Sequence, residues 1–324
     1  MFRRKALKTI VVSLAAPVAS ALGQGHFPSK PLRIVVPWTP GGAADLTARM
    51  LAGGLASRLG QPVIVENKAG AGGRIGTEEV ARALPDGYTL LLGGPSTNSI
   101  PYGLGTSLPY DPVDDFEPVA FVSRLPLAIV TNAQQGIDSL TTLIENAKAR
   151  PDLLTYGSAG PGSGTHLAMA AVLGANGVSL KHVPYRGQAP ALNDLLGGHI
   201  NLLLDQMASK PHVDGGRLRV LATTGEKRWF IFPNAPTLGE LGLSDLSIYS
   251  WQSLMVPRRT PREVIELLNV ATNGVLNTLA SKEFFQNNGM EAGGGSVESL
   301  RSVGRADAKR WQAVVKRYGI RVTD

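Results

Sequence analysis

Short apolar runs alternate with amphipathic stretches along residues 32–92. Runs of four or five residues are typical of buried strands, and the longer stretches space their apolar residues as on one face of a helix. The first helix is expected to end at Gly60, because Gly stops a helix and Pro62 cannot continue it. The pattern predicts strands at Leu32–Val36, Val63–Glu66 and Tyr88–Leu92, with one helix over about 45–59 and another ending near Leu84. Such alternation predicts a parallel sheet with right-handed crossovers.

The same alternation returns after a Pro-rich interval. It predicts strands at Leu127–Thr131, Leu153–Gly157, His182–Tyr185, Ile200–Asp205 and Leu218–Ala222, and helices at about Ser139–Ala149, Thr165–Leu173 and Ala189–Leu196. These segments predict a second α/β unit. Helices are also expected near Pro261–Leu279 and Ser296–Tyr318, but periodicity does not assign them to a sheet. A return of this tail to the first unit is one economical answer.

Composition is that of an ordered globular protein. Of the 324 residues, 43% are hydrophobic and 18% charged, and the length suits two modest domains or one large one. The chain has no cysteine, which excludes a disulfide scaffold, a thiolate metal site and a cysteine nucleophile. No nucleotide cofactor or metal is expected.

The N-terminus predicts export. Arg3, Arg4, Lys5 and Lys8 precede an apolar run, Thr9–Leu22, that holds the small residues Ala19-Ser20-Ala21. These are the three parts of a signal peptide, assigned here to residues 1–21. The run of about 14 residues is shorter than the ~20 that a permanent membrane span needs. We therefore expect a periplasmic protein, exported by either the general secretory or the twin-arginine route.

Most of the net charge belongs to this leader. Without its four cations, Lys and Arg fall from 32 to 28 against 25 Asp and Glu, and the net charge falls from +7 to +3. The largest remaining basic cluster lies on the last predicted helix and is read as a solvated face; it comprises Arg301, Arg305, Lys309, Arg310, Lys316 and Arg317. No nucleic-acid partner is expected, because that role needs a dense basic face with stacking aromatic residues.

Two glycine-rich loops predict an anion site. Pro40-Gly41-Gly42 precedes the first helix, and Gly157–His166 precedes a helix of the second unit. Ligands of open parallel sheets bind beyond the carboxyl ends of the strands, where such loops open helices. Each loop offers unobstructed N–H groups and a helix dipole that favours an anion. Two loops at equivalent points favour a carboxylate or phosphate site over simple tight turns.

Polar side chains on these strand-end loops are the further candidates. Hydroxyl groups of Ser96, Thr97, Ser158, Ser163 and Thr165 could contact a ligand, although each is about as good a helix cap. His166 could bind an anion or cap and pack at its helix start. Asp205 ends a predicted strand on the ligand side, where it could be a polar contact or a solvated residue.

Enzyme motifs fail on inspection. The chain has no Gly-x-Ser-x-Gly elbow, no Walker sequence and no HExxH spacing. The segment Gly70–Gly76 has the spacing of a dinucleotide fingerprint. It follows the second strand instead of the first, and the acidic residue expected about 20 positions on is missing. A structural turn is the better interpretation.

A series of motifs spans nearly the whole mature chain. They include Pro28–Pro37, Pro40-Gly41-Gly42 with Asp45, Leu59–Asn67, Gly70–Gly73, Pro85–Leu90, Leu108–Pro112, Ser158–His166, His182–Tyr185, Ala189–Leu192 and Leu195–Gly198. In order and spacing the chain resembles the Bug-type extracytoplasmic solute receptors, the substrate-binding components of tripartite tricarboxylate transporters.

The resemblance implies an α/β fold of the type II-like periplasmic binding protein kind, with two domains, mostly parallel sheets flanked by helices and a ligand cleft between them. Domain 1 would comprise residues 27–124 and 249–324, and domain 2 residues 125–248. A ligand carboxylate would sit in the cleft, held largely by backbone N–H groups and water. The residues implied for this site, together with the candidates above, are Trp38, Thr39, Gly41, Gly42, Ala43, Asp45, Ser96, Thr97, Ser158, Ala159, Gly160, Ser163, Thr165, His166 and Asp205.

The chain departs from the family at Ala43-Ala44, where a hydroxyl residue commonly precedes the aspartate, and at Trp38-Thr39. These departures bear on which acid is chosen. The expected function is a non-enzymatic receptor that delivers a small organic acid or acidic amino acid to membrane transporter subunits. Two alternatives stay open: a dinucleotide-dependent oxidoreductase, and a ligand sensor for a membrane kinase.

Overall fold

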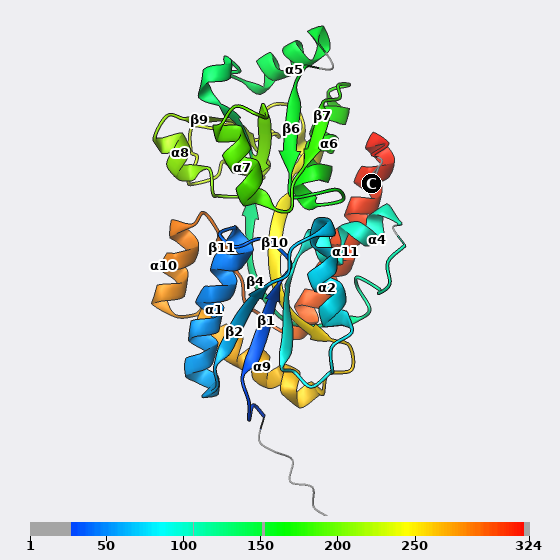
Figure 1. The fold of residues 1–324 in the computed structure, drawn as a ribbon, viewed down its shortest axis with the longest axis vertical. Helices are drawn as coiled ribbons and strands as arrows, with labels where there is room; N and C mark the ends of the chain where they lie inside the picture. Colours follow the sequence, from blue (N-terminus) through cyan, green and yellow to red (C-terminus); the bar gives the residue numbers. More distant parts are fainter. Residues whose placement is uncertain (1–26, 106, 151–152, 321–324) are drawn as a thin grey trace, which may run out of the picture.

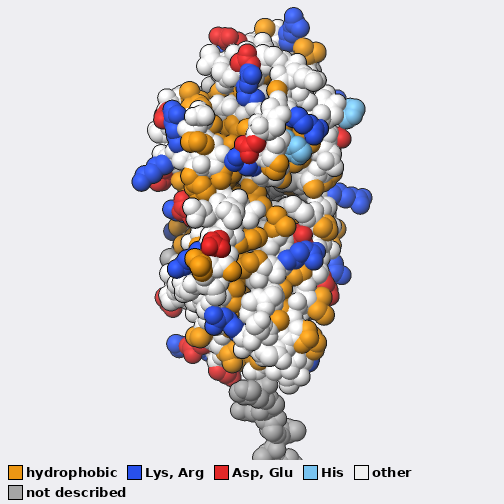
Figure 2. Space-filling view, turned by 90° about the vertical axis from the view of Figure 1, so that its left-hand side faces the viewer, with side chains coloured by type: hydrophobic (Ala, Val, Ile, Leu, Met, Phe, Trp, Pro, Cys, Tyr) orange, Lys and Arg blue, Asp and Glu red, His pale blue; other side chains and the backbone are white. Residues whose placement is uncertain are grey.

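Two α/β units are stacked along the long axis of the molecule (Figure 1). The computed structural model describes residues 27–105, 107–150 and 153–320, so the predicted signal peptide at 1–21 lies outside the described residues. Lys and Arg side chains are interspersed with Asp and Glu over the face shown in Figure 2. Among the described residues, no helix is both long and apolar enough to cross a membrane.

A six-stranded sheet with the order β11-β4-β10-β3-β1-β2 forms the first unit, which we call the six-stranded unit. Its strands are β1 (Leu32–Val36), β2 (Val63–Asn67), β3 (Thr89–Gly93), β4 (Phe116–Pro126), β10 (Tyr249–Pro257) and β11 (Glu291–Ala292). Its helical segments are α1 (Ala43–Leu59), η1 (Ala71–Gly73), α2 (Arg74–Ala81), α3 (Pro95–Asn98), α4 (Ile100–Leu104), α9 (Arg262–Leu276), α10 (Leu279–Asn287) and α11 (Val297–Tyr318).

A five-stranded sheet with the order β7-β6-β8-β5-β9 forms the second unit, the five-stranded unit. Its strands are β5 (Ala128–Asn132), β6 (Thr155–Ser158), β7 (Lys181–Pro184), β8 (Leu202–Asp205) and β9 (Leu218–Thr223). Its helical segments are η2 (Ala133–Gln135), α5 (Leu140–Ala149), α6 (Gly164–Ala175), α7 (Gln188–Leu196), α8 (Lys210–Asp214) and η3 (Ser244–Leu246).

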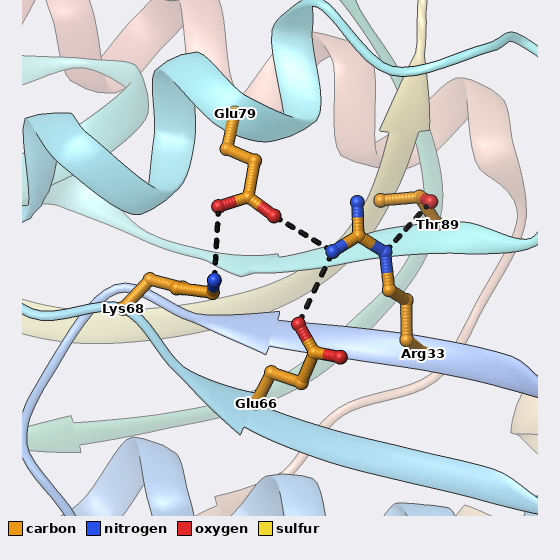
Figure 3. A network of polar contacts seen from close by, with 5 residues as sticks. All are labelled: Arg33, Glu66, Lys68, Glu79 and Thr89. Atoms are coloured by element: carbon orange, nitrogen blue, oxygen red, sulfur yellow. Dashed lines mark hydrogen bonds and ion pairs between the residues drawn. The ribbon is translucent and has the colours of Figure 1, made fainter.

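Apolar strands between helices give each sheet a buried centre. Four of the five residues of β1 and all five of β3 are buried, because α-helices cover both faces of the sheet. The exception in β1 is Arg33, whose guanidinium bonds Glu66, Glu79 and the Thr89 hydroxyl, while Lys68 lies 3.5 Å from Glu79 (Figure 3). This network ties β1, β2, β3 and α2 into one body.

The sheets are mixed, whereas the sequence predicted mostly parallel pairing. Parallel pairs join β1 to β2 and β3, and β6 to β7 and β8. Antiparallel pairs join β10 to β3 and β4, and β4 to β11, in the six-stranded sheet. In the five-stranded sheet, antiparallel pairs join β5 to β8 and β9. The reason is that β4 and β10 run between the two units in opposite directions, and β5 continues directly from β4.

Two long strands and one helix break were missed from the sequence. β4 lies in the Pro-rich interval, where Pro118 and Pro126 argue against a strand. The single helix expected over 261–279 is two helices, since the Thr278 hydroxyl accepts from the Ser281 N–H and starts α10 there. The other predicted helices and strands are confirmed to within about three residues.

The tail helix α11 lies along both units (Figure 1). Its apolar residues Leu300, Trp311 and Val314 are buried, whereas Val303 is 39% exposed. Its last turn is held on the five-stranded unit, where the Tyr318 hydroxyl donates to Asp245 (2.6 Å) and Arg317 pairs with the same carboxylate. The helix therefore makes a second connection between the two units, apart from the crossover strands β4 and β10.

Candidate ligand-binding site

A cavity of about 80 Å³ lies between the two units, at the ends of the strands that carry the predicted loops. Nine of the predicted residues line it: Trp38, Thr39, Gly42, Ala43, Ser96, Thr97, Ala159, Ser163 and Thr165. A water needs on the order of 10–15 Å³ on this scale, so the space suits a small molecule and not a dinucleotide.

The N-terminus of α1 opens onto this cavity. Gly42 is the N-cap residue, has extended backbone angles and supplies no side-chain cap. The cavity is lined by Gly42, Ala43 and Ala44, which belong to the first turn, where N–H groups lack helical partners. A Cβ added at Gly42 would meet nothing within 4 Å. An anion can therefore approach these N–H groups along the helix dipole.

The N-terminus of α6 meets the cavity from the other unit, but its hydroxyls are already engaged. Ser163 accepts from the His166 N–H (3.3 Å), and Thr165 accepts from the Ala159 N–H (3.2 Å). The Ser96 hydroxyl of α3 reaches across the units and accepts from the Gly164 N–H at 2.8 Å. Ser163 and Thr165 also bond to each other at 3.3 Å, so Ser163, Thr165 and Ser96 cap and connect in this structure.

Asp45 shapes the first loop and does not line the cavity. Its carboxylate accepts from the Gly41 N–H (3.0 Å) and from Arg49 (3.1 Å). Burial alone would raise the pKa of Asp45, but these hydrogen bonds outweigh it and hold the pKa below its ordinary value. Gly41 itself has φ +87°, a left-handed conformation that favours glycine.

Ser158 and His166 support the second loop from behind. The ring of His166 stacks on that of His182, 3.9 Å between centroids, and its Nδ1 accepts from the Gly162 N–H. Ser158 Oγ lies 2.6 Å from His182 Nε2 and accepts from the Gly160 N–H. Burial lowers the pKa of both histidines to about 4, and for His166 the neighbouring ring adds to the effect. Both rings are therefore neutral near pH 7.

Asp205 lies fully buried behind the cavity and does not line it. One carboxylate oxygen accepts from the Ser209 N–H (2.8 Å), and the other has no partner among the described residues. Burial raises the pKa of Asp205. Gly41, Asp45, Ser158, Gly160, His166 and Asp205 are thus the predicted residues that the structure places outside the cavity wall.

Sequence reasoning missed the wall that comes from the crossover strand and the tail. Tyr249, Ser250, Trp251 and Gln252 of β10, and Trp311 of α11, line the cavity. Trp251 is held by its indole N–H, which donates to Asp307 at 2.9 Å. Periodicity assigned the tail to no sheet, and the resemblance placed it in domain 1 without naming any of its residues as part of the site.

Two glutamines complete the polar wall. Gln188 donates to the Leu204 carbonyl (2.7 Å), and its buried Oε1 has no partner among the described residues. Gln206 donates to the Ser250 hydroxyl at 3.0 Å. Gly187 precedes Gln188 at a helix start, the same signal that identified the other two loops, so this residue could have been found.

No Lys, Arg, Asp, Glu or His side chain lines the cavity among the described residues. The described residues also contain no group of three His, Cys, Asp or Glu placed to hold a metal ion. A bound anion would therefore be held by N–H groups, hydroxyls and amides. Arg74 and Arg186 do not line the cavity.

The glycine-rich segment after β2 is covered by protein. A Cβ added at Gly72 would lie 2.6 Å from the Pro161 carbonyl oxygen, and one at Gly73 would meet the Trp38 ring at 3.0 Å. A pyrophosphate would need these faces open. The segment is a turn in contact with the other unit.

Known proteins match nearly the full length of the chain. Residues 47–320 match the family described as "Tripartite tricarboxylate transporter family receptor". Protein BugT of Bordetella pertussis (strain Tohama I) is 37% identical over 312 residues, covering 95% of each chain.

Solved structures from Rhodopseudomonas palustris superpose closely. Rpa4515 with adipate is 34% identical, with a TM-score of 0.86 over 91% of this chain and 99% of that one. MatC with bound malate is 29% identical, with a TM-score of 0.86 over 89% and 100%. The predicted fold class, two α/β units of the periplasmic binding protein type, is confirmed.

Proposed function

Because this chain belongs to the tripartite tricarboxylate transporter family of receptors, we propose that it is a periplasmic binding protein for a small carboxylate. The bound solute is an organic acid or an acidic amino acid, and it is delivered to membrane transporter subunits. Receptors of this kind bind and release; the proposed role involves no catalysis.

The observation that carries the proposal is the meeting of α1 and α6 at one small cavity. The first turn of α1 opens onto it without a side-chain cap, Ser163, Gly164 and Thr165 at the α6 terminus line it, and neutral hydroxyl and amide groups make up the rest of the polar wall. A helix terminus contributes about 0.3–1 kcal/mol, and charge-assisted hydrogen bonds about 1.5–3 kcal/mol each. Three or four such bonds reach the roughly 8 kcal/mol of micromolar binding.

The ligands of the solved relatives support the same class. Rpa4515 is described with adipate and MatC with malate, both small dicarboxylates. The first carboxylate of such an acid fits the α1 terminus. The cavity wall offers amides and aromatic rings to the remainder, through Gln188, Gln206, Gln252 and Trp251.

We further propose that residues 27–124 with 249–324, and residues 125–248, are domains that close on the ligand. The separate sheets support this division, and β4 and β10 form the connection between them. Contacts across the cleft, such as the Ser96 hydroxyl with the Gly164 N–H, support a closure of this kind. Export through cleavage of residues 1–21 is part of the same proposal.

The alternatives have less support. A sensor for a membrane kinase would use the same cavity, and no feature of the described residues favours it over transport. An oxidoreductase would need an open dinucleotide loop, whereas Gly72 and Gly73 pack against Pro161 and Trp38.

Thermal unfolding of the refolded, ligand-free mature protein tests the proposal. The panel would contain malate, adipate, monocarboxylates, acidic amino acids, sugars and NAD(P). Saturation at 100 times the dissociation constant adds about 2.7 kcal/mol. A shift with one class of acid and none with sugars is expected, and a shift with NAD(P) alone would revive the oxidoreductase.

A further inference from the structure

Two glycine-rich loops from different units touch at the edge of the cleft. Gly72 of η1 faces Gly160 and Pro161, which follow β6. A Cβ added at Gly72 would lie 2.6 Å from the Pro161 carbonyl oxygen, and a Cβ added at Gly160 would lie 3.4 Å from the Gly72 nitrogen. Gly72 has φ +66° and Gly160 φ +121°, so both positions favour glycine for backbone reasons too.

Two more contacts between the units accompany this one. The Thr39 side chain lies against Gly187, so that a Cβ added at Gly187 would be 3.4 Å from the Thr39 Cβ. The Ser96 hydroxyl accepts from the Gly164 N–H at 2.8 Å. We call the contacts at Gly72, Thr39 and Ser96 the rim contacts. All three join the six-stranded unit to loops of the five-stranded unit.

The Gly72 loop is held firmly on its own unit. It opens α2, which is tied to the sheet through the Arg33–Glu79 pair at 2.7 Å (Figure 3). A Cβ added at Gly76 of α2 would lie 3.1 Å from the Pro37 Cα, so this helix also packs on the loop that leads to the cavity. If an added side chain displaced Gly72, the loop could not move alone. The adjoining part of the six-stranded unit, including α2, would move away from the five-stranded unit with it.

We infer that Gly72 is a positioning residue for ligand affinity, although it does not line the cavity. Because Gly72 has no side chain, the Pro161 carbonyl can approach it closely. This close contact sets the distance between the N-termini of α1 and α6 at the cavity. Any larger residue holds the cleft open. The effect on affinity rests on the proposed function; the contact itself does not.

Disulfide trapping tests whether the rims meet in solution. The chain has no cysteine, so Thr39→Cys with Gly187→Cys creates a single pair. The Cβ separation of 3.4 Å lies just below the disulfide range of about 3.5–4.5 Å, so a shift of a tenth of an ångström brings the pair into range. Gly187 has extended backbone angles that any residue adopts. We expect rapid crosslinking under mild oxidant; no crosslinking in the mature protein would overturn the rim contacts.

A matched pair of glycine substitutions isolates Gly72. Gly72 (φ 66°, ψ 22°) and Gly60 (φ 67°, ψ 16°) have nearly the same backbone conformation, but a Cβ at Gly60 meets nothing within 4 Å. Gly72→Ala and Gly60→Ala therefore introduce the same local strain, and only the first obstructs the cleft.

In the double-cysteine background we expect Gly72→Ala to slow crosslinking roughly tenfold, equivalent to about 1.4 kcal/mol. Gly60→Ala should leave the rate unchanged. Equal rates in the two variants would overturn the inference. Ser96→Ala, which removes the acceptor of the Gly164 N–H, should also slow crosslinking and covers the case in which Gly72→Ala fails to fold.

Binding of malate and adipate to the single variants gives the second readout. For whichever acid binds the wild type, Gly72→Ala should raise the dissociation rate about tenfold relative to Gly60→Ala. Unchanged dissociation would contradict the role in affinity. Binding of neither acid to the wild type would count against these ligands of the proposed function, and the crosslinking result would still decide the rim contact.

Discussion

Gly42 is the position where a single side chain can separate electrostatics from shape. It caps α1, has extended backbone angles, and leaves open space where a Cβ would be. Asp and Asn are both good N-caps and have nearly the same size. Gly42→Asp places a negative charge where we propose the ligand carboxylate, and Gly42→Asn does not.

We expect both Gly42 variants to keep the melting temperature of the wild type or exceed it. Gly42→Asp should bind the cognate acid at least tenfold more weakly than Gly42→Asn, because like charges repel across a few ångströms of low-dielectric cavity. Isothermal titration of the two variants measures the ratio. Equal affinities would mean that no carboxylate lies at this helix terminus.

The stacked pair of His166 and His182 makes stability depend on pH. Burial lowers both pKa values to about 4, against about 6.5 in an unfolded chain. Between these values the unfolded chain binds more protons, so the free energy of unfolding falls as the pH is lowered from about 6.5 and is fully reduced below about 4. One such group contributes up to about 1.4 kcal/mol per pH unit.

His166→Asn tests this dependence, because the Asn oxygen can replace Nδ1 as acceptor for the Gly162 N–H. Urea unfolding at several values between pH 7 and pH 4 should show a shallower loss of stability in this variant. His199 is exposed, and His199→Gln should retain the wild-type slope. A wild-type slope in His166→Asn would show that this ring does not titrate on unfolding.

The site was predictable from sequence where a glycine loop opens a helix on the expected strand. Gly42, Ala43 and Ala159 line the cavity for that reason. The roles of hydroxyl and charged residues were harder to predict from the sequence, because helix capping and ligand contact require the same residue types. Asp45 and His166 turned out to hold the loops, through bonds that depend on exact chain positions.

At the scale of elements, the alternating pattern identified the short strands but not the long crossover strands. β4 and β10 pair antiparallel over nine positions and are buried along most of their length, so neither shows a two-residue alternation. A strand that is buried on both faces is a continuous apolar run, and periodicity alone cannot distinguish such a run from a segment of a buried helix. The cavity wall from β10 was lost with the strand.

Trp311 shows what α11 contributes as an element. It is 3% exposed, lines the cavity and packs in the core cluster of the five-stranded unit. Trp311→Ala should lower the free energy of unfolding by about 3–5 kcal/mol and weaken ligand binding as well. Tyr318→Phe, two turns later, removes only a solvent-exposed bond to Asp245 and should cost less than about 1 kcal/mol. Denaturant unfolding compares the two, and similar losses would contradict the anchoring role of Trp311.

For the whole molecule, the resemblance supplied what local patterns could not. Periodicity predicted two α/β units but could not place the tail. Order and spacing of motifs over nearly the whole mature chain implied the family, which the match over residues 47–320 confirms. Topology of this kind depends on contacts between segments more than a hundred residues apart, such as β4 with β10, which no local window contains.

The two sheets share buried side chains, and this determines how the molecule should unfold. One core cluster joins Ile34 and Leu254 of the six-stranded sheet to Leu203 and Trp229 beyond the crossover strands. A second cluster joins Ile100 and Trp311 to the core of the five-stranded unit. If one unit unfolded alone, these shared apolar surfaces would be exposed to water, which costs about 25 cal/mol of free energy for each Å² exposed.

We therefore expect ligand-free mature protein to unfold in one cooperative transition despite its two sheets. Calorimetry should give equal calorimetric and van't Hoff enthalpies. Bound acid should raise the single melting temperature without splitting the peak, because in the proposed function the ligand contacts both units and binds only when they are folded together. Two resolved transitions in the ligand-free protein would show that the shared clusters contribute too little to couple the units, and that closure is governed by the rim and the ligand alone.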